Sequence, residues 1–247
     1  MGEKSAALRK HLKEEHRTSP FQTYLKEIVY GGNDGIVTTF AVVAGFSGAN
    51  LGGNIPGYSF LTVLLFGLAN LLADGASMGL GNFLSLRSEQ DVYRSEQAKE
   101  RHEIKVHTSM EREETIDILV SKGFSQTHAK QLTAIYATNE DYWVQFMMND
   151  ELELANPLKE NPFLTAVATF ISFVIFGFIP LIPFFFALST SNAFVTSLLL
   201  TLVALVLLGM LRWRITRENI FRSIFEIVII GSVAASLAYF VGTMFKQ

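Results

Sequence analysis

The chain has 247 residues, of which 49% are apolar and 17% are charged, with no cysteine and a formal net charge of −3. The lack of cysteine excludes disulfides, thiolate metal sites and cysteine nucleophiles. The nearly neutral charge argues against nucleic acid as a partner. The charges are concentrated, because residues 87–160 hold 15 of the 23 acidic and 9 of the 20 basic residues. Residues 35–73, 161–211 and 227–245 hold none. A helix needs about 20 apolar residues to cross a bilayer, so these stretches indicate an integral membrane protein.

The polar first 26 residues lack the apolar core of a cleavable secretory signal, so we predict a cytoplasmic N-terminal segment over 1–26. Five transmembrane helices are predicted after it, the first two within 27–84 and the last three within 163–247. Their expected ranges are 27–48, 59–84, 163–188, 193–211 and 223–245.

The distribution of Lys and Arg sets the expected orientation. Basic residues occur in the N-terminal segment and in the link after the fourth span, whereas the links after the first and third spans carry none. Because basic residues favour the cytoplasmic side, residues 85–162 are predicted to be cytoplasmic and the C-terminus to lie outside. The predicted fold class is therefore all-α, a polytopic membrane protein with five spans and a helical cytoplasmic insert between spans two and three.

The insert is expected to contain three or four amphipathic helices. The first is expected to continue the second span, because no Gly or Pro interrupts the sequence just after residue 85. A stop is predicted at Gly123, with Ser125 capping the next helix. Thr138, three residues before Asp141, resembles a capping box for a helix that would run to Leu154.

Ionisable and polar side chains within the spans are candidates for an ion path, because such groups are costly in hydrocarbon. Glu27 and Asp34 are seven residues apart in span one, close to one helical face. Asn70, Asp74 and Met78 follow at spacings of four in span two. Oxygen ligands with one thioether suit a borderline divalent transition ion. The alternatives are that Asp34 and Asp74 are only hydrogen-bonded to neighbouring helices, and that Glu27 is a solvated interfacial residue.

The insert carries acidic pairs at helical spacing and two adjacent methionines. Pairs three residues apart share one helix face and could present ligands to a common centre. Solvated acidic faces and a methionine pair in a hydrophobic core are the alternative interpretation. The candidate metal ligands are Glu100, Glu103, Glu111, Glu114, Met147, Met148 and Glu151. No Glu-x-x-His motif of a di-iron oxidase and no nucleophile–base pair is found, so an enzyme is not predicted.

Two strings carry a family resemblance, NDGIVTTFAVVAG in span one and ADGASMGLGNFLS in span two. Together with GFIPLIPF in span three, they resemble the signature segments of the vacuolar iron transporter family. That family's known members are proton-coupled exporters of ferrous iron, and often manganese, from the cytosol. They are dimers whose path is lined by spans one and two.

The resemblance implies membrane-site ligands at Glu27, Asp34 and Met78. It departs at Asn70, where characterised relatives have a glutamate, and we infer that Asp74 supplies the missing charge. The seven insert residues match the glutamate and methionine pattern of the subfamily with a cytoplasmic metal-binding domain. No prosthetic group is expected, with Fe²⁺ or Mn²⁺ bound as substrate.

The sequence thus predicts a homodimeric metal(II)/proton antiporter. Its partners would be divalent metal ions, protons and the lipids of a prokaryotic plasma membrane or a eukaryotic vacuolar membrane. Two alternatives remain open, a carrier for hard ions such as calcium or magnesium and a membrane-anchored iron sensor or store.

Overall fold

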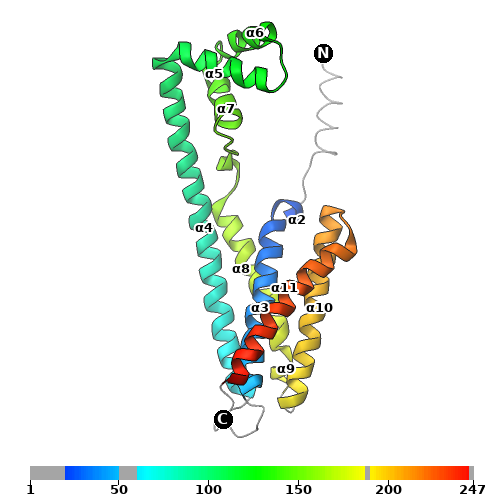
Figure 1. Cartoon of the computed structure of the whole chain (residues 1–247). Coiled ribbons are helices and arrows are strands. Elements are labelled where there is room, and N and C mark those ends of the chain that lie inside the picture. Colours follow the sequence, from blue (N-terminus) through cyan, green and yellow to red (C-terminus); the bar gives the residue numbers. More distant parts are fainter. Residues whose placement is uncertain (1–19, 50–59, 187–189, 245–247) are drawn as a thin grey trace, which may run out of the picture. The chain divides into compact units, whose positions relative to one another are not determined.

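The structure is a computed structural model that describes residues 20–49, 60–186 and 190–244. Every regular element among these residues is a helix (Figure 1). The chain divides into two compact units, the first formed by Met1–Asn82 and Phe163–Gln247 and the second by Phe83–Pro162. The second unit starts two residues before the predicted insert and ends at the same residue.

The first unit is built from long apolar helices. Four helical segments of the described chain are long and apolar enough to cross a membrane, namely Phe60–Val106, Pro162–Phe185, Asn192–Thr216 and Ile220–Met244. Helix α3 is 25 residues long but holds Glu27, Asn33, Asp34 and five glycines, and it is not among those four. A fifth span therefore stays a prediction. The helices of this unit are α2 (Pro20–Thr23), α3 (Leu25–Ala49), the first part of α4 (Phe60–Val106), α8 (Pro162–Phe178), η2 (Ile179–Leu181), α9 (Ile182–Phe185), α10 (Thr190–Thr216) and α11 (Ile220–Met244).

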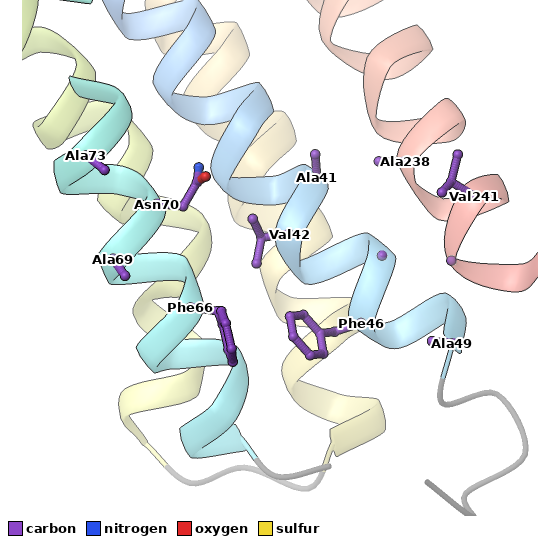
Figure 2. A pocket seen from close by; sticks show the side chains of 12 residues that line it. Ala41, Val42, Phe46, Ala49, Phe66, Ala69, Asn70, Ala73, Ala238 and Val241 are labelled. Carbon is purple, nitrogen blue, oxygen red and sulfur yellow. The ribbon is translucent and has the colours of Figure 1, made fainter. Parts of the chain in front are cut away.

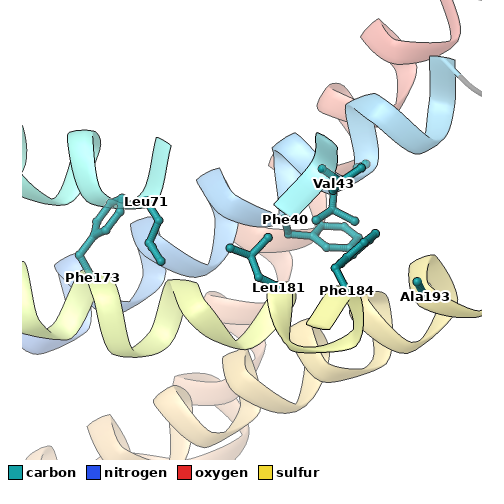
Figure 3. Packing of buried hydrophobic residues seen from close by; sticks show 9 residues of the cluster. Phe40, Val43, Leu71, Phe173, Leu181, Phe184 and Ala193 are labelled. Carbon is teal, nitrogen blue, oxygen red and sulfur yellow. The ribbon is translucent and has the colours of Figure 1, made fainter. Parts of the chain in front are cut away.

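Glycines allow α3 to approach its neighbours closely. A Cβ on Gly35 would collide with the backbone carbonyl of Phe173 in α8, and a Cβ on Gly48 would lie 2.7 Å from the carbonyl oxygen of Tyr239 in α11. Backbones can come this near only where one residue has no side chain. The buried cluster that includes Phe40 and Phe184 packs around these crossings (Figure 3).

The third predicted span is interrupted rather than continuous. Helix α8 ends at Phe178, and the chain passes through η2 into the short α9. Pro180 and Pro183 cause the break, since proline has no N–H and its ring disturbs the preceding turn. The carbonyl oxygen of Pro180 instead accepts a 2.7 Å hydrogen bond from the Ser197 hydroxyl of α10.

Helix α4 runs without a break from Phe60 to Val106, as predicted (Figure 1). The second unit contains its last part with α5 (Thr108–Ser121), α6 (Gln126–Tyr136), α7 (Glu140–Asp150) and η1 (Pro157–Lys159). The expected stop is confirmed at Gly123, whose φ of +97° lets the Phe124 N–H reach the Leu119 carbonyl at 3.1 Å. Ser125 caps α6, also as predicted, by accepting from the His128 N–H.

Two predicted boundaries of α7 are wrong. Its N-cap is Asn139 rather than Thr138, because the Asn139 side chain accepts from the Tyr142 N–H, whereas the Thr138 hydroxyl donates back to the Ile135 carbonyl. The helix ends at Asp150 rather than continuing to Leu154, with Glu151 as its C-cap. This early end matters because it places Glu151 at a helix terminus.

Candidate metal sites

Three predicted ligands of the second unit converge on one point. Glu100 comes from α4, Glu111 from the first turn of α5 and Glu151 from the end of α7, and one carboxylate oxygen of each lies within 4.8 Å of the others. An ion equidistant from three oxygens separated by as much as 4.8 Å would lie about 2.8 Å from each, whereas oxygen ligands of transition ions lie at roughly 2.0–2.2 Å. Small side-chain rotations would close that gap.

The cluster is buried on one side and open on the other. Glu100 is 3% exposed and Glu111 is 5% exposed, whereas Glu151 is exposed. One oxygen of Glu100 and one of Glu111 are buried without a hydrogen-bond partner in the described structure. Such an unpaired oxygen is costly unless a proton or cation occupies the space beside it.

Burial and mutual repulsion raise the pKa values of these carboxyls. Desolvation, followed by the charges of Glu111 and Glu151, raises the pKa of Glu100 to about 8. Desolvation is also the main cause that raises the pKa values of Glu111 and Glu151. Glu100 and Glu111 share a hydrogen bond that favours a protonated Glu100. The metal-free cluster therefore holds a proton on Glu100 near neutral pH, and a divalent cation would displace it.

Glu103 and Glu114 surround this cluster without joining the close triad. Both side chains are exposed, and both interact electrostatically with Glu111 and Glu151. They add negative charge at the solvent side of the cluster, where an arriving cation would meet it first.

The two methionines lie in the hydrophobic core of the second unit. Met147 and Met148 are both 0% exposed and pack in one cluster with Trp143. The Thr115 hydroxyl donates to the Glu111 carbonyl at 2.7 Å, lies 3.4 Å from the Met147 sulfur and accepts a 2.8 Å hydrogen bond from the Trp143 indole N–H. Thr115 lies one turn after Glu111, so the Met147 thioether lies near the carboxylates. In this structure, however, it packs in the hydrophobic core.

Ion pairs fix α7 at both ends. Arg101 of α4 contacts Glu140 at 2.9 Å and Asp141 at 2.7 Å in the first turn of α7, and Lys105 contacts Glu140 at 3.0 Å. At the other end, Lys122 pairs with Asp150, the residue before Glu151. Exposed pairs contribute little stability individually, but this set fixes the register of α7 against α4 and α5. Sequence reasoning missed it, since the partners are up to 40 residues apart.

The polar residues of α3 differ in their surroundings. Glu27 is only 8% exposed, which is inconsistent with the solvated interfacial alternative. Asp34 is half-buried, and its backbone carbonyl accepts a 2.8 Å hydrogen bond from the Thr38 hydroxyl. Asp34 also interacts electrostatically with Asp74 of α4. The structure therefore brings these two predicted ligands, one from each of the first two spans, near each other.

The predicted ligands on α4 are only partly covered by the rest of the same chain. Asp74 is exposed, while Met78 is partly buried against the core of the first unit. Asn70 lines a cavity of about 820 Å³ between α3, α4 and α11, and among the described residues of its walls it is the only one with a polar side chain (Figure 2). Its other walls are formed by Ala41, Val42, Gly45, Phe46, Ala49, Phe66, Ala69, Ala73, Ala238, Val241 and Gly242.

Comparison with known proteins places these residues in a family. The family model described as the VIT family matches residues 25–243. The chain belongs to the VIT family. It is 33% identical over 229 residues to vacuolar iron transporter 1 of Arabidopsis thaliana, covering 93% of this chain and 88% of that protein. It is 34% identical to vacuolar iron transporter 1 of Oryza sativa subsp. japonica, over 93% of this chain and 87% of that protein. It is 33% identical to the vacuolar iron transporter of Toxoplasma gondii, over 94% of this chain and 78% of that protein.

The family match confirms the resemblance seen in the sequence. It includes α3, α4 and the whole second unit, and therefore both predicted ligand sets. The relatives are named as transporters, which agrees with the prediction that the chain is not an enzyme.

Proposed function

We propose that the protein is a metal(II)/proton antiporter that removes ferrous iron or manganese from the cytosol across a membrane. The observation that carries this proposal is the family match over residues 25–243 to proteins named vacuolar iron transporters. The apolar helices of the first unit supply the membrane-spanning part, with α3 as the fifth span.

The ion path is assigned to α3 and α4. Asp34 and Met78 would coordinate the ion, since a carboxylate and a thioether together suit ferrous iron and manganese better than calcium or magnesium. Asp74 and Glu27 would exchange protons as the path opens alternately to the two sides. Asn70 can offer an oxygen to the ion but cannot carry a proton.

A homodimer would complete this path. Asp74 is exposed on its own chain, and a charged side chain facing lipid would be unstable. The apolar cavity around Asn70 is likewise open in one chain. A second copy packed along α3 and α4 would cover both features and double every ligand.

The second unit would collect ions on the cytoplasmic side. Its converging carboxylates repel one another when empty, and a divalent cation relieves this repulsion. Because metal and proton compete for the same oxygens, the neutral cytosol favours metal loading of this cluster, whereas release on an acidic side would occur at the carboxylates of α3 and α4.

Sealed proteoliposomes with an imposed pH gradient test the proposal. Ferrous iron uptake is followed while a trapped dye records internal pH, for the native chain and for Asp34→Asn. We expect uptake that requires the gradient, is accompanied by opposite proton movement and is lost in the variant. Uptake without any change in internal pH would contradict antiport but not transport.

One observation favours a second candidate, a membrane-anchored iron sensor or store. Within one chain, three carboxylates converge only in the second unit among the described residues. A sensor would bind metal through these residues and show no uptake above protein-free vesicles.

A further inference from the structure

A second pocket of the first unit contains none of the residues proposed for the ion path. It has a volume of about 540 Å³ and lies between the start of α3, the end of α10 and the start of α11. These helix ends belong to the side that the basic residues place in the cytoplasm. The pocket is lined by Leu25, Lys26, Val29, Tyr30, Asn33, Arg212, Thr216, Glu226, Ile227 and Ile230.

The charges around this pocket leave Lys26 without a counter-ion. Glu226 accepts from Arg212 and from Arg222 at 2.8 Å each, and Glu218 lies 4.0 Å from Arg212. Lys26 is exposed and has no ion-pair partner in the described part of the chain. Its neighbour Glu27 is buried and does not line the pocket. Among the residues that line the pocket, the two bases Lys26 and Arg212 therefore exceed the one acid, Glu226, by one charge.

The rest of the pocket is mainly apolar and contains one unpaired acceptor. Val29, Ile227 and Ile230 supply apolar wall. The Asn33 side-chain oxygen is buried and has no hydrogen-bond partner among the described residues. A buried oxygen of this kind is satisfied when an occupant brings a hydroxyl or ammonium donor.

We propose that this pocket binds the headgroup of an anionic phospholipid that carries both a phosphate and a hydroxyl donor, as phosphatidylglycerol does. Lys26 and Arg212 face the phosphate, Asn33 accepts from the headgroup hydroxyl, and the apolar wall contacts the start of an acyl chain. Basic pockets between membrane helices on the cytoplasmic side are suited to anionic headgroups. Tyr30, which is 63% exposed, is the kind of aromatic residue found at the membrane surface. This inference requires that the helices span a membrane but not that the protein transports iron.

Native mass spectrometry of the delipidated full-length protein tests the proposal. Phosphatidylglycerol and phosphatidylcholine with the same acyl chains are titrated separately, since both carry phosphate but only the first carries hydroxyl donors. The variants are Lys26→Gln and Asn33→Ala. The matched control is Arg214→Gln, an exposed base in the last turn of α10 that does not line the pocket.

We expect one tightly held phosphatidylglycerol per chain and weaker phosphatidylcholine. Lys26→Gln should lower phosphatidylglycerol affinity roughly fivefold, the effect of one basic residue near a membrane surface. Asn33→Ala should reduce the preference for phosphatidylglycerol, and Arg214→Gln should change neither value. Equal affinity for the two lipids, or equal losses in Lys26→Gln and Arg214→Gln, would overturn the proposal. Displacement of the lipid by millimolar inorganic phosphate would also overturn it, in favour of a free-phosphate site.

Discussion

Replacing Glu100 by glutamine should stabilise the metal-free protein at pH 8 and abolish its response to metal. Glu100 is 3% exposed, with a pKa raised from 4.5 to about 8 by desolvation and by the charges of Glu111 and Glu151. Because the pKa is higher in the folded state, the folded chain binds the extra proton. The native protein therefore loses stability as pH rises from about 4.5 to about 8. Glutamine stays neutral over this window.

The rise of this pKa from 4.5 to about 8 sets an upper bound of roughly 5 kcal/mol on the free energy of unfolding that is lost when Glu100 ionises. Solvent reaches the cluster from the Glu151 side, and Glu111 retains its own repulsion with that residue. We therefore expect a gain of roughly 2 kcal/mol at pH 8, or roughly 10 °C for a unit of this size. At pH 5 the gain should nearly vanish.

The assay is thermal unfolding of the full-length protein in detergent with a chelator, followed by tryptophan fluorescence. The chain has two tryptophans, so a Trp213→Phe background leaves the buried Trp143 as a reporter of the second unit. Glu113→Gln is the matched control, because this exposed residue of α5 lies outside the triad. Added Mn²⁺ should raise the native midpoint at pH 8 but not that of Glu100→Gln. Parallel pH dependences of the native protein and Glu100→Gln would show that the pH dependence does not come from Glu100.

Three further predictions concern packing and proton number. Gly35→Ala should destabilise the protein by roughly 1–3 kcal/mol, because its Cβ would collide with a backbone carbonyl of α8. Gly81 faces open space, so Gly81→Ala should stabilise α4 by up to about 1 kcal/mol. Thermal unfolding should therefore show a lower midpoint for Gly35→Ala and a higher one for Gly81→Ala. Thr115→Val should cost roughly 1–3 kcal/mol and alter Trp143 emission, because the buried indole N–H loses its acceptor; unchanged stability and emission would contradict this. Asn70→Glu should leave the number of protons moved per iron in proteoliposomes unchanged, because Asp74 is proposed to supply the charge in its place, and a raised ratio would show that Asp74 does not perform this role.

The sequence predicted the helices well where one physical signal dominates. The charge-free stretches located the apolar helices, and the uninterrupted residues after 85 predicted that α4 continues as one helix. It failed where neighbouring residues compete, as at Thr138 and Asn139, both of which can cap a helix. The break after Phe178 was missed because a strongly apolar segment hides the effect of two closely spaced prolines.

The candidate site was only partly predictable. Spacing alone put Glu100 with Glu103 and Glu111 with Glu114, yet the structure brings Glu100, Glu111 and Glu151 together from three helices. Helical periodicity shows which residues share a face of one helix. The meeting of carboxylates from three helices depends instead on where α7 ends and on the ion pairs that position it. No pattern in one sequence encodes those distant pairings.

Ferrous iron uptake by Asp34→Asn, compared with Glu100→Gln in the same proteoliposomes, tests most directly whether iron crosses the membrane along α3 and α4. Asp117→Asn, an exposed acid of α5, serves as the control. We expect Asp34→Asn to abolish uptake while still binding Mn²⁺ through the second unit, and Asp117→Asn to behave as native. Native-level uptake by Asp34→Asn, or no uptake by the native protein despite bound metal, would contradict it.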